Sequence, residues 1–146
     1  GNSNSSSEEV DKVVEIVHQL TSGETTFINQ KGEEATLTTS DIKIITPYNA
    51  QVQAIKQQLA TLEVGTVDKF QGQEAPVVVV SLAASNYEEA PRGIDFILNF
   101  NRMNVALSRS QCLSIVVGSP SLTHLHYQNL NSIRLTNFHR TLMSSN

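Results

Sequence analysis

The fold is set by the stretch Ile42-Lys43-Ile44-Ile45-Thr46-Pro47, in which a β-branched run ends at a proline. Residues with branched β-carbons favour strands, and proline disfavours a central strand because it has no backbone N–H. After Pro47, apolar residues recur at helical spacing, at Val52, Ile55, Leu59 and Leu62. We therefore expect a strand followed directly by a helix, which is the unit of a parallel sheet.

The same alternation continues along the chain. Apolar runs predict further strands over 64–67, 77–82 and 113–118, with a helix over 103–110 between the last two. Strands that are apolar on both faces belong to a parallel sheet that is covered on both sides. The expected fold is therefore α/β, a three-layer α/β/α sandwich with a mostly parallel sheet.

The two ends of the chain carry further local signals. Ser6 and Glu9 have the spacing of a capping box, and a helix should follow as far as Leu20, with one apolar face made of Val10, Val13, Val14, Val17 and Leu20. We expect a loop with a short hairpin over 21–40 and a terminal helix over 122–130. Residues 1–7 are only Gly, Asn and Ser, so we expect a tag remnant or disordered leader there and one folded domain over 8–146.

Length and composition limit the classes of protein. With 146 residues, 39% of them hydrophobic, the chain fits one domain that buries a core. No apolar run approaches the roughly 18 residues that cross a bilayer, so we expect an intracellular, cytoplasmic protein with no membrane partner. With a net charge of −4, the chain as a whole lacks the excess of Lys and Arg that is usual for an independent nucleic-acid-binding domain. This charge does not exclude a motor domain, which needs only a narrow strip of backbone contacts.

Cysteine and histidine give no sign of a metal site. The single cysteine, Cys112, lies beside an apolar run, so we interpret it as a small core residue. The four histidines, at positions 18, 124, 126 and 139, do not have the grouping of a metal site. We expect no metal to be bound by this chain itself.

Three polar strings stand out on this frame: Ile44-Ile45-Thr46-Pro47-Tyr48-Asn49-Ala50-Gln51, Thr66-Val67-Asp68-Lys69-Phe70-Gln71-Gly72-Gln73-Glu74 and Asn101-Arg102-Met103-Asn104-Val105-Ala106-Leu107-Ser108-Arg109. The first two follow predicted strands, and in parallel sheets ligands gather beyond the carboxyl ends of strands. In this order the strings resemble motifs IV, V and VI of superfamily 1 DNA/RNA helicases of the nonsense-mediated-decay and Dna2-like group. The resemblance covers residues 41–120 and implies a RecA-like, AAA-type motor domain with a P-loop NTPase fold.

The motif VI string carries two arginines. Arg102 and Arg109 lie seven residues apart, so a helix would present both on nearly one face. Arginine has a planar donor fork that suits phosphate oxygens. The resemblance implies that Arg109 is the arginine finger that reaches the γ-phosphate, with Arg102 beside it in the catalytic set. The alternative is a pair of solvated surface arginines.

The motif V string contains a glycine in a polar loop. Gly72 would let the backbone approach a phosphate, or turn with positive φ in a plain tight turn. The resemblance implies that Gln71 belongs to the catalytic set at the nucleotide and that Glu74 approaches the ribose. It also implies that Thr66 and Asp68 couple this loop to the nucleic-acid backbone. The alternatives are a solvated or capping Glu74, a strand-end hydroxyl at Thr66 and a turn-forming Asp68.

The motif IV string places an aromatic residue at a strand end. Tyr48 follows Pro47, where its ring can serve as a stacking surface for a base. The resemblance implies that Tyr48 packs on the adenine, that Gln51 belongs to the cofactor site and that Thr46 contacts nucleic acid. The alternatives are a Tyr48 at the edge of the core and a Gln51 that caps the next helix.

One string departs from the family pattern. Relatives often carry arginine where the string Ala83-Ala84-Ser85-Asn86 has Ala84, so any contact made by that cation is in doubt. Asn86 is retained as a predicted nucleic-acid contact.

The phosphate-binding loop G-x-x-x-x-G-K-[ST] does not occur in this sequence, nor does a Walker-B-like acidic pair directly at the end of an apolar strand. ATP should therefore bind between this domain and a partner domain. The resemblance implies that this partner is an N-terminal RecA-like domain of the same polypeptide, which holds most of the ATP and Mg²⁺. We predict the C-terminal motor domain of an ATP-dependent helicase that moves on single-stranded DNA or RNA and is inactive in isolation. The alternative is a non-catalytic, nucleotide-responsive or nucleic-acid-binding module. A generic cofactor domain would need a G-x-G-x-x-G turn, which the sequence lacks.

Overall fold

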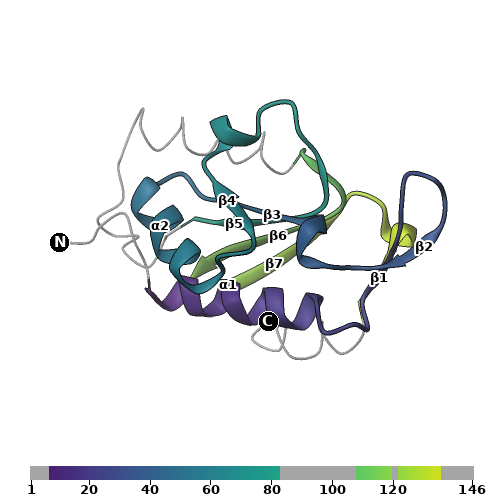
Figure 1. Ribbon diagram of the computed structural model, residues 1–146, viewed down its shortest axis with the longest axis horizontal. Helices are drawn as coiled ribbons and strands as arrows, with labels where there is room; N and C mark the ends of the chain where they lie inside the picture. Colours follow the sequence, from purple (N-terminus) through teal and green to yellow (C-terminus); the bar gives the residue numbers. More distant parts are fainter. Residues whose placement is uncertain (1–6, 83–107, 120–121, 136–146) are drawn as a thin grey trace.

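The computed structural model describes residues 7–82, 108–119 and 122–135 (Figure 1). Within these ranges it contains a five-stranded sheet, a smaller three-stranded sheet and two α-helices. With η marking 3₁₀ helices, the elements in chain order are α1 (Ser7–Leu20), β1 (Thr26–Ile28), β2 (Glu34–Thr36), η1 (Thr39–Asp41), β3 (Ile42–Ile45), α2 (Asn49–Gln58), β4 (Glu63–Gly65), η2 (Val67–Phe70), β5 (Ala75–Ser81), β6 (Ser110–Ser119), β7 (Leu122–Tyr127), η4 (Leu130–Ser132) and β8 (Ile133–Arg134).

The larger sheet has the strand order β4-β3-β5-β6-β7. β3 pairs in parallel with both β4 and β5, and β5 pairs in parallel with β6. Only β7, next to β6, runs antiparallel to its neighbour. β3 and β5 are almost entirely buried, as expected of strands that are covered on both faces. The predicted α/β class with a mostly parallel sheet is confirmed.

Both α-helices cover one face of this sheet. The apolar sides of α1 and α2 pack in one core cluster with alternate residues of β3, β5 and β6. In β5 the alternation sends Val77 and Val79 into this cluster and Val78 and Val80 to the opposite face. Figure 1 shows α1 running along the sheet. The predicted helices ending near Leu20 and following Pro47 are both present.

On the opposite face, η2 covers part of the sheet. Its Phe70 is 1% exposed and packs with Ile45, Val78 and Val80. The predicted three-layer sandwich needs helices on both faces of the sheet, and most of the further helix predicted over 103–110 lies outside the described residues. Within the described ranges, the α-helical layer therefore lies on one face only.

The end of that predicted helix is wrong. Ser108 and Arg109 form a turn, and Ser110 is already the first residue of β6. The physical reason is backbone pairing, because Ser110 is in register with Ala75 of β5 and draws the chain into the sheet before residue 113, where the strand was predicted to begin. The leader boundary also shifts, since Ser7 belongs to α1.

The predicted terminal helix over 122–130 is wrong as well. Residues 122–127 form β7, which pairs antiparallel with β6. Thr123 is buried, Leu125 and Tyr127 are half-buried and His126 is exposed, which is the alternation of a strand. The half-burial of Tyr127 raises the pKa of its hydroxyl. Beyond β7, the N–H groups of Gln128 and Asn129 donate to the carbonyl of Cys112, at 2.8 and 3.3 Å.

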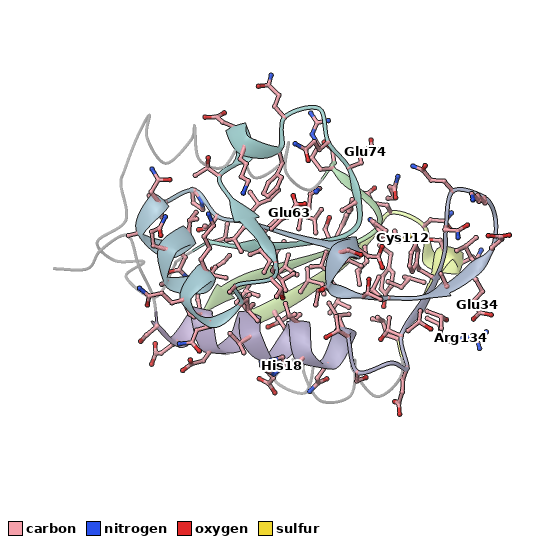
Figure 2. All side chains as sticks on the ribbon, in the orientation of Figure 1. His18, Glu34, Glu63, Glu74, Cys112 and Arg134 are labelled. Atoms are coloured by element: carbon pink, nitrogen blue, oxygen red, sulfur yellow. The ribbon has the colours of Figure 1, made fainter. Side chains whose placement is uncertain are left out.

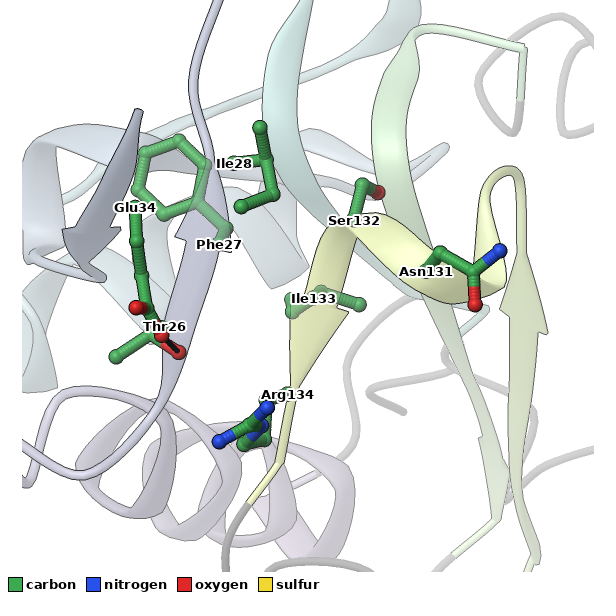
Figure 3. Close-up of a pocket in the computed structure, with 8 residues that line it drawn as sticks. All are labelled: Thr26, Phe27, Ile28, Glu34, Asn131, Ser132, Ile133 and Arg134. Atoms are coloured by element: carbon green, nitrogen blue, oxygen red, sulfur yellow. Dashed lines mark hydrogen bonds between the residues drawn. The ribbon is translucent and has the colours of Figure 1, made fainter. Parts of the chain in front are cut away.

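The smaller sheet has the order β2-β1-β8, with both pairings antiparallel. The β1–β2 hairpin confirms the hairpin predicted within 21–40, whereas β8 comes from far along the chain and was not predicted. An open pocket of about 280 Å³ lies on this sheet. Figure 3 shows its lining residues, none of which belongs to the three motif strings: Thr26, Phe27, Ile28, Glu34, Asn131, Ser132, Ile133 and Arg134.

Candidate functional site at two edges of the sheet

The residues predicted to be functional fall at two opposite edges of the larger sheet. The parallel strands β3, β4 and β5 end at Ile45, Gly65 and Ser81, and we call this side the carboxyl edge. β5 and β6 begin side by side at Ala75 and Ser110, and we call this side the amino edge. β5 is seven residues long, so at about 3.3 Å per residue the two edges lie roughly 20 Å apart.

Motif IV leaves β3 at the carboxyl edge. Thr46 is fully buried, and its N–H donates to the carbonyl of Gly65 at 3.1 Å. Its Oγ1 has no hydrogen-bond partner among the described atoms, which is uncommon for a buried hydroxyl. Tyr48 is half-buried and is the N-cap of α2, where its carbonyl accepts from the N–H groups of Gln51 and Val52 at 3.0 and 3.1 Å. The loop is therefore fixed through its backbone.

Gln51 lies inside the protein and does not cap the helix. Its side chain is fully buried, and its Nε2 donates to Ser81 Oγ at 3.1 Å. Ser81 Oγ donates in turn to Glu9 Oε1 at 2.8 Å. The sequence analysis missed Ser81 and assigned Glu9 only a capping role, because residues 72 positions apart give no pattern that links them.

The first half of motif V also lies at the carboxyl edge. Thr66 is half-buried and is the N-cap of η2, where its side chain makes no capping hydrogen bond. Asp68 is exposed on η2, and its carbonyl accepts from the N–H of Gln71 at 3.3 Å. Because the Thr46 N–H is bonded to Gly65, the motif IV and motif V loops start side by side.

The Lys69 side chain lies close to the backbone of β4 and holds η2 against that strand. Lys69 Nζ donates to the carbonyl of Val64 at 3.3 Å and lies 5.5 Å from the centroid of the Phe70 ring. A Cβ at position 65 would collide with Lys69 Cδ. Gly65 therefore lets the lysine stem lie flat over the end of β4, a requirement that the sequence pattern alone did not reveal.

Beyond η2 the motif V loop crosses to the amino edge. Gln71, Gly72, Gln73 and Glu74 are all exposed, and Figure 2 labels Glu74 on this loop. Gly72 has φ +79°, and none of the described atoms lies within 4 Å of where its Cβ would be. The predicted positive φ is confirmed, and the backbone conformation is what requires glycine here. The expectation that this whole string lies beyond the carboxyl end of a strand holds only for its first half.

Arg109 joins this loop at the amino edge. The N–H of Ala75 donates to the carbonyl of Arg109 at 3.1 Å, which places Glu74 and Arg109 on neighbouring chain segments. Arg109 is half-buried and lies in the turn that enters β6. A guanidinium, an amide side chain and a carboxylate are thus presented from adjacent parts of one edge. These groups can donate to phosphate oxygens and accept from hydroxyl groups.

The structure brings only part of each predicted set together. Arg109 lies at the amino edge next to Glu74, while Gln71 and Gly72 belong to the loop that leads there from η2, where the Gln71 N–H is bonded to the Asp68 carbonyl. Tyr48 and Gln51, which were grouped with Gly72 and Glu74 in one cofactor site, lie instead at the carboxyl edge with Thr46 and Thr66. Arg102 and Asn86 lie outside the described residues.

In 7–82, 108–119 and 122–135, no group of three His, Cys, Asp or Glu side chains is placed to hold a metal ion. None of the helices in these ranges is long and apolar enough to cross a membrane.

Comparison with known proteins identifies a family and several relatives of this chain. The AAA domain family model matches residues 1–121. The chain is 34% identical over 128 residues to the putative helicase mov-10-B.1 of Danio rerio, covering 77% of this chain and 12% of that protein. It is 39% identical to RNA helicase Mov10l1 of Mus musculus and 40% identical to DNA polymerase alpha-associated DNA helicase A of Schizosaccharomyces pombe, each over 58% of this chain and over 8% and 13% of those proteins.

The chain thus spans only about a tenth of the length of these relatives. The family match covers most of the chain and includes all three motif strings. The relatives are RNA and DNA helicases, as the resemblance of those strings predicts. The chain therefore belongs to the AAA domain family and is a superfamily 1 helicase domain of the nonsense-mediated-decay and Dna2-like group.

Proposed function

We propose that this chain is the second motor domain of an ATP-dependent helicase and that it completes an ATP site built mainly by another domain. The observation that carries the proposal is the bond between the Ala75 N–H and the Arg109 carbonyl at 3.1 Å. Through it, the exposed loop 71–74 and the turn that bears Arg109 form one polar edge. The sequence supplies no phosphate-binding loop, so this edge needs a partner domain that carries one.

Arg109 would act on the phosphate at this edge. Its guanidinium is always charged, and its donor fork matches the oxygens of a phosphoryl group whose negative charge spreads as the bond to the leaving group breaks. Half-burial keeps part of the water away, so the attraction is stronger than it would be in bulk solvent. Gln71 would orient groups at the cleft between the domains, and the Glu74 carboxylate would accept from a ribose hydroxyl.

ATP fits these groups, whereas a resident metal finds no group of carboxylates in the described ranges. We propose that an N-terminal RecA-like domain of the same polypeptide holds Mg²⁺ and most of the nucleotide. When bound, ATP supplies the phosphoryl group whose transfer is coupled to closure and reopening of the two domains. This chain contributes charge and hydrogen bonds to that site, and we expect it to hydrolyse no ATP alone.

The carboxyl edge would carry the single strand. Tyr48 lies roughly 20 Å or more from the amino edge, so a nucleotide held at Glu74 and Arg109 would not reach it. We therefore propose that Tyr48 stacks on a base of the strand and not on the adenine of ATP. The half-buried Thr66 hydroxyl would contact the strand backbone. Thr46, which the sequence predicted to contact nucleic acid, is 0% exposed and cannot reach a strand directly, so it would only support the loop. The relatives include RNA helicases and a DNA helicase, so we propose both kinds of strand as substrates.

The test is the ATPase activity of the full polypeptide that carries this chain, measured with and without oligo(U) or oligo(dT). We expect Arg109→Ala to lower the strand-stimulated rate by a factor on the order of 10³, the usual effect of removing an arginine finger. Arg134→Ala is the matched control, because Arg134 is an exposed arginine on β8 of the smaller sheet.

An Arg109→Ala variant that keeps the full rate would overturn the proposal and favour a nucleic-acid-binding module without catalysis. Equal losses in the Arg109 and Arg134 variants would also contradict it, because the effect would then not depend on the amino edge.

A further inference from the structure

A continuous chain of buried polar side chains joins three elements at the carboxyl edge. Gln51 Nε2 donates to Ser81 Oγ at 3.1 Å, and Ser81 Oγ donates to Glu9 Oε1 at 2.8 Å. All three residues are 0% exposed. Glu9 and Gln51 belong to the first turns of α1 and α2, and Ser81 is the last residue of the central strand β5. We call these three residues the buried relay.

The order of donors and acceptors in the relay is fixed. A hydroxyl can donate only one hydrogen bond, and the Ser81 hydroxyl uses it on Glu9 while it accepts from Gln51. Glu9 therefore has to present an acceptor oxygen at this point. A buried carboxyl group is costly unless hydrogen bonds satisfy it. The amino end of α1 also favours a negative charge in its first turn, where Glu9 lies.

The relay is connected directly to the motif IV loop. The backbone N–H of Gln51 donates to the carbonyl of Tyr48 at 3.0 Å, while the Gln51 side chain is held by Ser81. A movement of the Gln51 side chain would therefore shift the turn that bears Tyr48. Thr46, at the start of the same loop, is buried next to this edge.

We propose that Glu9 is a positioning residue for single-strand binding, acting through Ser81 and Gln51 on the Tyr48 loop. The proposal rests on the proposed function, because it needs the carboxyl edge to hold the strand. Glu9 lies in no helicase motif string, so the proposal adds a site on α1 to those three strings. The relay fixes Tyr48 before the strand arrives, so the free energy of stacking is not spent on ordering the loop.

The experiment uses the full polypeptide and compares Glu9→Ala, Glu9→Gln and Ser81→Ala. We measure the ATPase rate against oligo(U) and oligo(dT) concentration at saturating ATP, and against ATP at saturating strand. Glu9→Ala and Ser81→Ala should raise the strand concentration for half-maximal rate by roughly three- to tenfold, the effect of losing about one hydrogen-bonded contact. The KM for ATP should stay within about twofold, because the nucleotide is assigned to the other edge.

Glu9→Gln should restore most of the strand affinity, because glutamine keeps an acceptor oxygen for the Ser81 hydroxyl. Ser114→Ala is the matched control for simple loss of a buried serine. Ser114 lies on β6, is 0% exposed and bonds to Ser110 Oγ at 2.7 Å, outside the relay. It should lower the melting temperature without changing the strand concentration for half-maximal rate.

Three outcomes separate the possibilities. A lowered melting temperature with unchanged strand affinity in Glu9→Ala and Ser81→Ala would overturn the positioning role and leave a structural one. Equal rises in the KM for ATP and in the strand concentration for half-maximal rate would also overturn it. Failure of the proposed function itself is recognised separately, because Arg109→Ala would then keep its full rate in the same assay.

Discussion

The amino and carboxyl edges of the larger sheet are built in different ways. At the amino edge the predicted side chains of loop 71–74 are exposed, and a backbone hydrogen bond between Ala75 and Arg109 sets their place. At the carboxyl edge Thr46 and Gln51 are fully buried, and side chains from two helices and a strand hold the loop. Apart from Gly72 with its positive φ, substitutions at the first edge should therefore change chemistry with little effect on folding, whereas those at the second should change both.

The largest effect is expected from Arg109→Lys, which tests the amino edge because it keeps the charge and removes the planar donor fork. We expect the strand-stimulated ATPase rate to fall by about 10²-fold or more, because a lysine ammonium cannot make the same paired contacts with phosphate oxygens. The strand concentration for half-maximal rate should be unchanged. A lysine variant with the wild-type rate would mean that charge alone is sufficient at the amino edge.

The next effect tests the carboxyl edge through Tyr48→Ala. We expect about a tenfold rise in the strand concentration for half-maximal ATPase rate, because stacking of one base on an aromatic ring contributes about 1–3 kcal/mol. The KM for ATP should not change. Tyr48→Phe is the matched control and should bind the strand nearly as well, because it keeps the ring. A raised KM for ATP in Tyr48→Ala would mean that Tyr48 contacts the adenine. The two edges would then not bind separate ligands.

A smaller effect is expected from Gly72→Ala. At φ +79° an alanine costs about 1–2 kcal/mol of folding free energy, although no atom in the described part of the chain obstructs its Cβ. Urea unfolding of this chain would measure the loss. Gly23→Ala, at φ +102° in a turn outside the motifs, should lose a similar amount. If Gly72→Ala also lowers the ATPase rate of folded full-length protein, the backbone at the amino edge approaches the nucleotide.

The smallest effect is expected from Glu63→Gln, which sets the background for the others. Glu63 is 59% exposed and pairs with Lys43 Nζ at 3.0 Å, and exposed ion pairs contribute about 0–1 kcal/mol. Its loss should lower the free energy of unfolding of this chain slightly at low salt and less at high salt, where the charges are screened. Neither the ATPase rate nor strand affinity of the full-length protein should change. If Glu63→Gln changed the ATPase rate or the strand affinity, similar changes on substitution at either edge would not be specific to that edge.

The sequence was most informative where hydrophobic period and burial agree. The runs 42–46 and 77–82 are apolar enough to predict central strands, and Val52 and Ile55 recur at the spacing of the α2 helix. The backbone conformation of Gly72 could also be predicted from the local sequence, because a positive φ favours glycine wherever it occurs. The predicted helix over 122–130 failed because the pairing of β7 with β6 is a tertiary contact that a local pattern does not contain.

The grouping of the candidate site was harder to predict than its members. Motif V is a single string, yet its two ends face opposite edges because η2 and the loop 71–74 that follows it lead from the end of β4 to the start of β5. The bonds from Gln51 to Ser81 and from Ser81 to Glu9 span 30 and 72 positions, so no local spacing rule could link them. Sequence motifs thus name the residues, and only the strand order places them relative to one another.

The burial of Cys112 offers an internal probe of local opening. Its thiol is the only one in the sequence, it is 3% exposed, and its carbonyl is bonded to the N–H groups of Gln128 and Asn129. A thiol-reactive reagent should therefore reach it only when β6 and the turn after β7 separate. The labelling rate of this chain consequently reports the equilibrium of that opening, independently of any catalytic assay. Because the sequence has no second cysteine, the label can only be at Cys112, and the mass of the intact chain is enough to follow the reaction.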